Sequence, residues 1–479
     1  MNRLNRRTFL AGGAAGAAAS LMPGLSVAAD PRGTNDAILI YVFLRGGIDG
    51  LSLYAPGSGH PDRGHYEGLR PSGSVRLPTS GPHAMQMLGS TGFGMNSAAA
   101  PLVDLWNDHD LAIVHATGLP IVNRSHFEAE RFIELGTPGA TEGLPPSQPQ
   151  IDGVRTTSTG WLTRHLASAT NLPPTMTMPV VATETQVTLS LTNEPAATTL
   201  RYPDDFDFSL NNFEEEVEDR LASIYAADGS DIGIAGEQAM IAQSLVEEVF
   251  DESNKDYNIA LGRPYPIRDP TNPDSNLESI SDKLITLARL IKAEPGLGLR
   301  IAQVDYGGWD DHTVQGSLPQ GTNGSSGNYY DRLDRLSRAV NAFWADMAGQ
   351  FDAGPDRRGK VTVIFHSEFG RRAYNNADNG TDHGSGNPMM LLGGNVNGGQ
   401  FHGEWPGMSS GELYQGNDLR TTNDFRRVLS EVLIRRQGNP NLGMVFPYYY
   451  NYRPLGVVNG PDQLPNYGPD DDITSNGFE

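Results

Sequence analysis

The sequence predicts an α/β protein whose doubly wound, mainly parallel sheet carries helices on both faces. Short apolar runs alternate with amphipathic segments of helical period along the chain, and this alternation is typical of parallel strands joined by crossover helices. The 479 residues, 38% of them hydrophobic, are enough for a large core. Polar residues also follow several apolar runs directly, at the place where ligands of an open parallel sheet bind.

The strands are predicted from the apolar runs. Residues 36–44 form a near-continuous apolar stretch and are expected to be the first buried strand. Further strands are expected at 110–115, 176–191 (in shorter runs), 299–304, 360–365 and 388–392. Residues 55–97 are rich in Gly, Pro and Ser and show little periodicity, so we expect surface loops there.

The helices are predicted from apolar periodicity and from capping residues. Ser125 is followed three residues later by Glu128, the pattern of a capping box at a helix start. Thr159 is expected to cap the helix after it. The predicted helices span residues 99–106, 126–135, 161–169, 213–226, 237–250, 277–293, 330–350 and 421–437.

The N-terminal segment has the pattern of a twin-arginine export signal. Arg6 and Arg7 precede an apolar Ala- and Gly-rich stretch, and small residues follow where cleavage would occur. We expect residues 1–29 to be this signal and the twin-arginine translocase to export the protein to the periplasm or beyond; the alternative is an uncleaved anchor. Residues 30–446 are expected to form the α/β domain, with a helical insertion at about 200–275. Residues 447–479 form a Tyr- and Pro-rich tail with an acidic end.

Charge and cysteine content exclude several classes of function. The chain has 35 Lys and Arg against 57 Asp and Glu, a net charge of −22, so binding to nucleic acid is not expected. It contains no cysteine, which excludes disulfides, thiolate catalysis and cysteine-type zinc sites. No later stretch of the mature chain is long and apolar enough to predict an integral membrane segment.

Five groups of polar residues lie at strand ends or in nearby loops and are expected to converge on one edge of the sheet. Carboxylates and imidazoles in such a mixture can hold one or two divalent ions, with Zn²⁺, Mn²⁺ and Ca²⁺ as candidates, although the site could also hold none. The expected ligands are Asp49, Asp305, Asp310, His312, Glu368, Asp382 and His383. Residues expected behind these ligands are His115, His126 and His366.

The chemistry that suits these residues is metal-assisted hydrolysis at phosphorus or sulfur. Ser125 is the expected nucleophile, because a helix N-terminus attracts an anion and a metal lowers the pKa of a hydroxyl. Arg45, Arg371 or Arg124 is expected to bind the non-bridging oxygens of the ester. Each residue also has a structural explanation: Ser125 as a helix cap, Asp49 as part of a turn, and Glu368 as the partner of a neighbouring arginine.

These residues resemble a family of twin-arginine-exported bacterial proteins known as domain of unknown function 1501 (DUF1501), which is similar in fold to the alkaline phosphatase and sulfatase superfamily. The resemblance covers nearly all of the mature chain and rests on residues 44–51, 124–127, 308–312, 367–371, 380–384 and 418–429. It implies an alkaline-phosphatase-like topology.

The superfamily resemblance also implies roles for individual residues. Asp49 resembles the metal ligand of the first strand, and Ser125 resembles the nucleophile at a helix start. Residues 381–383 are similar to the late histidine motif of phosphopentomutase-like members. One feature departs from the superfamily pattern, because Glu368 stands where those enzymes have an Asp-His pair.

The sequence therefore predicts an exported, metal-dependent hydrolase of phosphate or sulfate esters, acting on a small-molecule or polysaccharide substrate. The rival hypothesis is an exported binding or assembly protein that kept the fold without the chemistry. A metal-dependent oxidoreductase is a weaker alternative, because the chain has no dinucleotide-binding fingerprint. The enzyme hypothesis requires the site residues to meet at one point.

Overall fold

The computed structural model describes most of the chain. The predicted signal at 1–29 and the acidic end of the tail at 469–479 lie outside the described residues. The described residues are 35–71, 73, 75–139, 157–173, 176–201, 214–250, 265–266, 280–293, 297–351 and 354–468.

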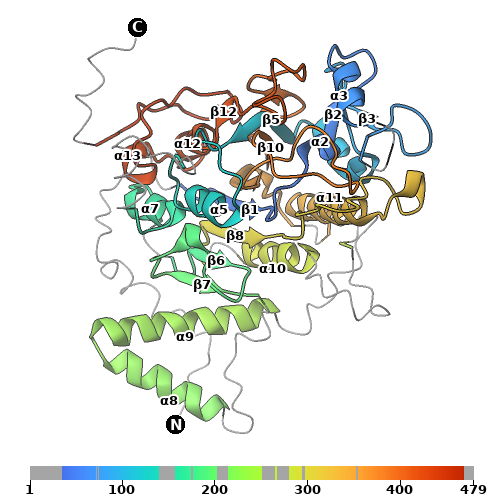
Figure 1. The fold of residues 1–479 in the computed structure, drawn as a ribbon. Coiled ribbons are helices and arrows are strands. Elements are labelled where there is room, and N and C mark those ends of the chain that lie inside the picture. Colours follow the sequence, from blue (N-terminus) through green and yellow to red (C-terminus); the bar gives the residue numbers. More distant parts are fainter. Residues whose placement is uncertain are drawn as a thin grey trace.

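One large mixed, mostly parallel sheet organises the described residues (Figure 1). Its strands lie in the order β11 (Phe401–His402), β5 (Leu111–Gly118), β10 (Asn387–Gly393), β9 (Val361–His366), β1 (Ile38–Phe43), β8 (Ile301–Asp305), β6 (Val180–Ala182) and β7 (Ala197–Thr199), and β12 (Asn423–Asp424) pairs with β5. The central strand β1 is parallel to β8 and β9. The prediction of an α/β protein with a mainly parallel sheet is confirmed.

Strand β10 is the exception to the parallel arrangement. It runs antiparallel to both of its neighbours, β9 and β5. The connection from β9 to β10, residues 367–386, contains no helix, and an antiparallel neighbour needs no helical crossover. That loop is therefore available to carry polar side chains at the edge of the sheet.

Helices cover both faces of the sheet, as predicted. Successive side chains of a strand point to opposite faces, and in β1 Ile38, Ile40 and Val42 join one apolar cluster while Leu39, Tyr41 and Phe43 join another. The first cluster contains α4 (Ala100–Asn107), α10 (Ile280–Lys292) and α11 (Asn328–Met347). The second contains α5 (His126–Glu134), α7 (Trp161–Ser168), α12 (Phe425–Arg435) and α13 (Leu442–Val445).

Two local predictions are wrong. Residues 55–97 are not all surface loops, because they contain α3 (Arg63–Leu69) and the small sheet of β2 (Tyr54–Pro56), β4 (Phe93–Met95) and β3 (Gln86–Met87). Their buried residues, such as Tyr66 and Leu77, are too irregularly spaced to show a period. Residues 186–191 end in the short 3-10 turn η3 (Leu189–Leu191) rather than in a strand. The other short turns are α2 (Gly50–Leu53), η2 (Ser97–Ala99), η7 (Thr322–Gly324) and η8 (Arg358–Lys360).

Two helices lie in the range predicted as a helical insertion. They are α8 (Glu214–Ala227) and α9 (Asp231–Phe250), which pack against each other; α9 also contacts α10 (Figure 1). The remainder of that range lies largely outside the described residues. None of the helices that the structure describes combines the length and apolar composition needed to cross a membrane.

The described part of the tail packs on the α/β core. Val457 and Val458 are buried in the same apolar cluster as α12. The buried carboxylate of Glu431, on α12, accepts backbone hydrogen bonds from residues 455, 456 and 458. The described part of the tail, residues 447–468, is therefore attached to α12 by apolar packing and by hydrogen bonds to Glu431.

Candidate metal centre

The carboxyl ends of three neighbouring strands bring the polar loops together. Phe43 at the end of β1 pairs with Asp305 of β8 on one side and His366 of β9 on the other. The loops that follow β8 and β9 are joined by bridges from Thr313 to Asn379 and from Arg371 to His383. Parallel strands thus deliver the loops to one edge of the sheet.

Four side chains meet at this edge, and we call them the Asp310 cluster: Asp310, His126, His312 and His383. The Oδ1 atom of Asp310 lies 3.0 Å from His312 Nε2, 3.1 Å from His383 Nε2 and 3.3 Å from His126 Nε2. The Nε2 atoms of His312 and His383 are 2.9 Å apart. The side chains of Asp310 and His312 are 45% and 42% exposed, so solvent reaches the cluster.

The second nitrogen of each imidazole faces an oxygen. His126 Nδ1 is 2.7 Å from Glu368 Oε1, and His383 Nδ1 is 2.7 Å from the carbonyl oxygen of Arg124. His312 Nδ1 lies 3.4 Å from Asp382 Oδ1. A proton assigned to each Nδ1 leaves three Nε2 lone pairs around one carboxylate oxygen. Histidines that bind metals typically have this outer partner.

The donor set fits a divalent cation. The buried Nε2 atom of His126 makes no hydrogen bond, and a buried polar atom without a partner is costly unless another group satisfies it. Donor atoms of His126, Asp310 and His383 lie within 4.8 Å of one another. Imidazole and carboxylate donors suit zinc and manganese alike, so the described residues offer a possible metal site without identifying the ion.

Glu368 lies behind His126 rather than among the Nε2 atoms. It is fully buried, and its Oε1 atom accepts a hydrogen bond from the Gly46 amide at 2.8 Å as well as facing His126. Its Oε2 atom is 3.0 Å from Ser367 Oγ. Glu368 also forms a second possible metal-binding group with His126 and Glu130. Its closest contacts make it the outer partner that orients His126.

Arg45 and Asp305 are bound to each other and not to the Asp310 cluster. The guanidinium of Arg45 pairs with Asp305, with Glu130 at 2.9 Å and with Glu134 at 3.0 Å. The other oxygen of Asp305 accepts a hydrogen bond from Gln303. Arg45 therefore pairs with three carboxylates at once, and its single positive charge is engaged with these protein groups.

Glu130 and Glu134 were not predicted from the sequence. Both follow His126 at intervals of four residues on α5, so the three share one helix face. That spacing was the available signal, but surface glutamates show the same spacing. The structure distinguishes them from surface residues, because Glu134 is buried and Glu130 contacts Arg45.

The protonation of Glu130 predicts a pH dependence. Burial raises the pKa of Glu130 from 4.5 to about 7, although Arg45 opposes the shift. The folded protein thus holds this proton more tightly than the unfolded chain, and the resulting stabilisation, full below pH 4.5, is lost as pH rises through about 7. Between about pH 5 and about pH 8, the unmodified metal-free protein should lose unfolding free energy relative to Glu130→Gln.

Urea unfolding of both metal-free proteins at the two pH values measures this difference. Glu404→Gln removes an exposed carboxylate and serves as the control, which should follow the unmodified protein. A difference between Glu130→Gln and the unmodified protein that stays constant with pH would show that Glu130 titrates alike in the folded and unfolded states.

Arg371 is buried and holds the loops together. Its guanidinium donates to the carbonyl oxygens of Gly47 and Thr381, at 2.7 and 2.8 Å, and to Asp310 Oδ1 at 2.5 Å. Burial alone would raise the pKa of Asp310, but the hydrogen bond and the positive charge of Arg371 hold it well below its ordinary value. Arg371 therefore fixes a cluster residue and has no exposed face for a substrate.

Asp49 lies beneath the cluster in a separate buried network. Its carboxylate makes two 2.8 Å contacts with Arg70 and accepts hydrogen bonds from Ser52 and Gln315. The Oε1 atom of Gln315 accepts a hydrogen bond from Thr381 at 2.7 Å. Asp49 thus reaches the cluster only through other side chains, and its oxygens are committed to protein partners.

Ser125 stands immediately before His126 at the start of α5, but the predicted capping box is wrong. The Ser125 side chain makes no capping hydrogen bond. Asn123 makes the hydrogen bonds at this helix start instead. Its side chain accepts a hydrogen bond from the Ser125 amide at 2.8 Å and donates one to the Glu128 carboxylate at 2.7 Å. Similarly, Gly160 and not Thr159 is the N-cap of α7. Within the described contacts, the Ser125 hydroxyl is left for another role.

The remaining predicted residues lie apart from the Nε2 atoms. His366 is buried with Nδ1 2.8 Å from the Tyr41 hydroxyl, and His115 is buried with Nδ1 2.8 Å from the Tyr54 hydroxyl. Burial lowers the pKa of each histidine to about 3. Asp382 is 41% exposed and its Oδ1 atom accepts from Asn376 at 3.1 Å. Of these three, only Asp382 touches the cluster.

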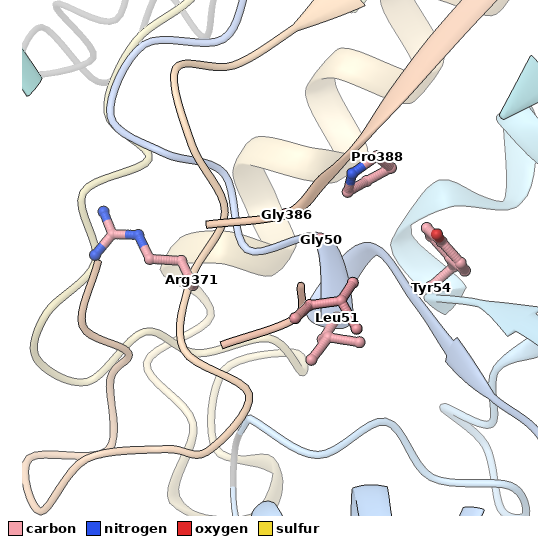
Figure 2. A pocket seen from close by; sticks show the side chains of 7 residues that line it. Gly50, Leu51, Tyr54, Arg371, Gly386 and Pro388 are labelled. Carbon is pink, nitrogen blue, oxygen red and sulfur yellow. The ribbon is translucent and has the colours of Figure 1, made fainter. Parts of the chain in front are cut away.

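A small cavity borders Arg371 from the inner side. Figure 2 shows its lining residues, among them Leu51, Tyr54 and Pro388, with the Arg371 guanidinium extending away from them. Its volume of about 10 Å³ is room for about one water molecule. The cavity is therefore too small for an ester substrate, and the exposed side chains of the cluster are those of Asp310 and His312.

One comparison with known proteins bears on the site. Residues 237–438 match a family model described as "Protein of unknown function (DUF1501)". The matched segment contains Asp310, His312 and His383, whereas His126 lies outside it. No curated protein matches the chain.

Proposed function

The chain belongs to this DUF1501 family, and we propose that it is an exported, metal-dependent hydrolase of phosphate or sulfate esters. The observation that carries the proposal is the convergence of three imidazole Nε2 atoms on Asp310 Oδ1 at 3.0–3.3 Å. Export is proposed from the twin-arginine pattern at Arg6 and Arg7.

The residues that would hold the ion are those of the Asp310 cluster. A divalent ion bound there supplies a Lewis acid that polarises the ester and stabilises the leaving oxygen. Glu368 and the Arg124 carbonyl orient two of the imidazoles through their Nδ1 protons. The exposed sides of Asp310 and His312 leave room for water and substrate, a feature of catalytic rather than structural metal sites.

Ser125 is the proposed nucleophile. Its hydroxyl makes no capping bond, and it precedes His126 at a helix N-terminus, where backbone amides favour an anion. Of the three arginines considered from the sequence, Arg45 and Arg371 are engaged with protein groups. Arg124 has the most exposed side chain, 30%, although it pairs with Asp418. It is therefore the proposed contact for non-bridging ester oxygens.

One observation favours the non-catalytic alternative. Arg371 already lies 2.5 Å from Asp310 Oδ1, so its charge compensates part of the carboxylate without an ion. In that case the cluster would fasten two loops of an exported binding or assembly protein. A metal-free protein with full thermal stability would support this reading.

The proposal is tested by metal analysis of protein purified after export, followed by assays with aryl phosphate and aryl sulfate esters. We expect a bound divalent ion and hydrolysis of one ester class. His383→Ala should lose both the ion and turnover, whereas Ser125→Ala should keep the ion and lose turnover. Unchanged turnover in both variants would contradict the proposed function.

A further inference from the structure

We propose that the substrate is a polymer with repeated sulfate or phosphate groups, and that Arg372, together with Arg124, binds an anionic group next to the reacting ester. This inference rests on the proposed hydrolysis of sulfate or phosphate esters and names the class of substrate. We call Arg124 and Arg372 the arginine pair. Arg372 has no part in the metal centre described above.

The arginine pair is attached to the same backbone as the Asp310 cluster. The carbonyl oxygen of Arg124 lies 2.7 Å from His383 Nδ1, and the amide of Arg372 donates to the carbonyl oxygen of Asp382 at 2.9 Å. The backbone of Asp418 forms a bridge with that of Arg372. The Asp418 carboxylate accepts a hydrogen bond from Arg124 Nε at 3.0 Å. Asp418 therefore links the two arginines, one through its side chain and the other through its backbone.

The positive charge of Arg372 is only partly compensated. The buried carboxylate of Asp418 is close to both arginines of the pair, but its ion pair is with Arg124. Asp382 also attracts Arg372, yet its Oδ1 atom faces His312 and Asn376. Among the residues that the structure describes, Arg372 makes no ion pair with a carboxylate. Its charge is therefore available to an anion of the substrate.

The hydrogen-bond donors of Arg372 are also only partly used. Its Nη1 atom donates to the hydroxyl of Tyr374. Its buried Nε atom has no partner, and within the described contacts its Nη2 atom has none either. A guanidinium can donate two parallel hydrogen bonds to one oxyanion. The Tyr374 ring lies 5.7 Å from the guanidinium carbon, and a side chain that is already held in place loses less entropy when it binds a ligand.

The open surface at the cluster favours a polymer over a small molecule. Pockets for small ligands usually bury about 70–90% of the ligand surface. Here Asp310 and His312 are 45% and 42% exposed, and the cavity next to Arg371 has a volume of about 10 Å³. A long chain can lie across such a surface and place successive anionic groups on the arginine pair. The net charge of −22 repels a polyanion in general, so binding depends on local positive charge.

Polymer binding tests the inference without measuring turnover. The full exported chain is stripped of metal with a chelator, dialysed, and titrated by calorimetry with dextran sulfate, inorganic polyphosphate and uncharged dextran. We expect one or both charged polymers to bind and uncharged dextran not to bind. The charged polymer that binds more tightly identifies the ester as a sulfate or a phosphate.

Variants assign the binding to Arg372. Arg372→Gln should weaken polymer binding by about 10-fold or more, because it removes hydrogen bonds to a charged group. Arg372→Lys keeps the charge without the paired donors and should bind with intermediate affinity. Arg220→Gln makes the same change in net charge at an exposed arginine on α8 and should bind as the unmodified protein does. If Arg372→Gln fails to fold, the reduced affinity of Arg372→Lys is the test.

The outcomes separate this inference from the proposed function. Polymer binding that is absent, that is unchanged in folded Arg372→Gln and Arg372→Lys, or that is weakened equally in Arg220→Gln would overturn the inference. Hydrolysis of aryl esters by the metal-loaded protein would in that case still support the proposed function. If the polymers bind as expected and no ester is hydrolysed, the arginine pair belongs to an exported binding protein and the hydrolase proposal alone fails.

Discussion

Replacing Asp310 by alanine is expected to lower the affinity of the protein for its divalent ion by at least about 100-fold, because even an outer-shell partner contributes about 10- to 100-fold. Asp310 Oδ1 is the atom that lies close to all three imidazoles, with three Nε2 atoms within 3.3 Å. Without the carboxylate, the imidazoles have no anionic ligand to accompany them. Titration of metal-stripped protein with Mn²⁺ or Zn²⁺ measures the loss.

Two further variants make this result specific. Glu368→Gln keeps the shape of the outer partner of His126 but removes its charge, and should cost about 10-fold in metal affinity. Asp378→Ala removes an exposed carboxylate from the same loop as His383 and should leave the affinity unchanged. If Asp310→Ala bound the ion as tightly as Asp378→Ala does, Asp310 would not be a ligand.

The buried strands and the convergence of the site were accessible from sequence because they depend on local patterns. β1, β8 and β9 are continuous apolar runs, and parallel strands that lie side by side must place their carboxyl ends at one edge. Asp310 and His312 closely follow β8, and His383 lies in the connection 367–386 that follows β9. Their meeting is therefore a consequence of chain direction and sheet order.

The roles of Asp49 and Asp305 could not be predicted in the same way. Both stand at the ends of parallel strands, as metal ligands would. A carboxylate pairs with the cationic group that the tertiary structure places next to it, however, and that group can be an arginine instead of a metal ion. For Asp49 that cation is Arg70, which comes from a region without visible periodicity. For Asp305 it is Arg45, itself a residue predicted to bind substrate. The choice of partner is a tertiary property.

The direction of β10 and the hydrogen bonding of Ser125 were also not predictable from local sequence patterns. The alternation of strands and helices implied parallel neighbours, whereas the connection 367–386 forms no helix and returns antiparallel. The Ser125–Glu128 spacing suits a capping box, but Asn123 occupies the hydrogen bonds that would form it. The capping box does not form because the side chain of Asn123, two residues before Ser125, makes these hydrogen bonds instead.

Replacing Asp49 by asparagine is expected to lower the free energy of unfolding by about 3–5 kcal/mol, the usual cost of removing one partner from a buried ion pair. The side chains of Asp49 and Arg70 are 3% and 0% exposed and make two contacts of 2.8 Å. The amide side chain of the variant would keep the shape of the carboxylate and leave the Arg70 guanidinium buried without its counter-charge. Urea unfolding measures the change.

Comparison with two other variants shows whether the stability lost in Asp49→Asn comes from the buried ion pair. Asp36→Asn breaks an ion pair with Lys360 whose side chains are both more than half exposed, and should cost no more than about 1 kcal/mol. The double variant Asp49→Asn/Arg70→Met removes both charges and should recover much of the lost stability, because no unpaired charge stays buried. Metal affinity of folded Asp49→Asn should stay within about 10-fold of the unmodified value, since Asp49 acts on the cluster only through Gln315 and Thr381. Full stability combined with lost metal binding would instead make Asp49 a ligand, as the sequence alone predicted.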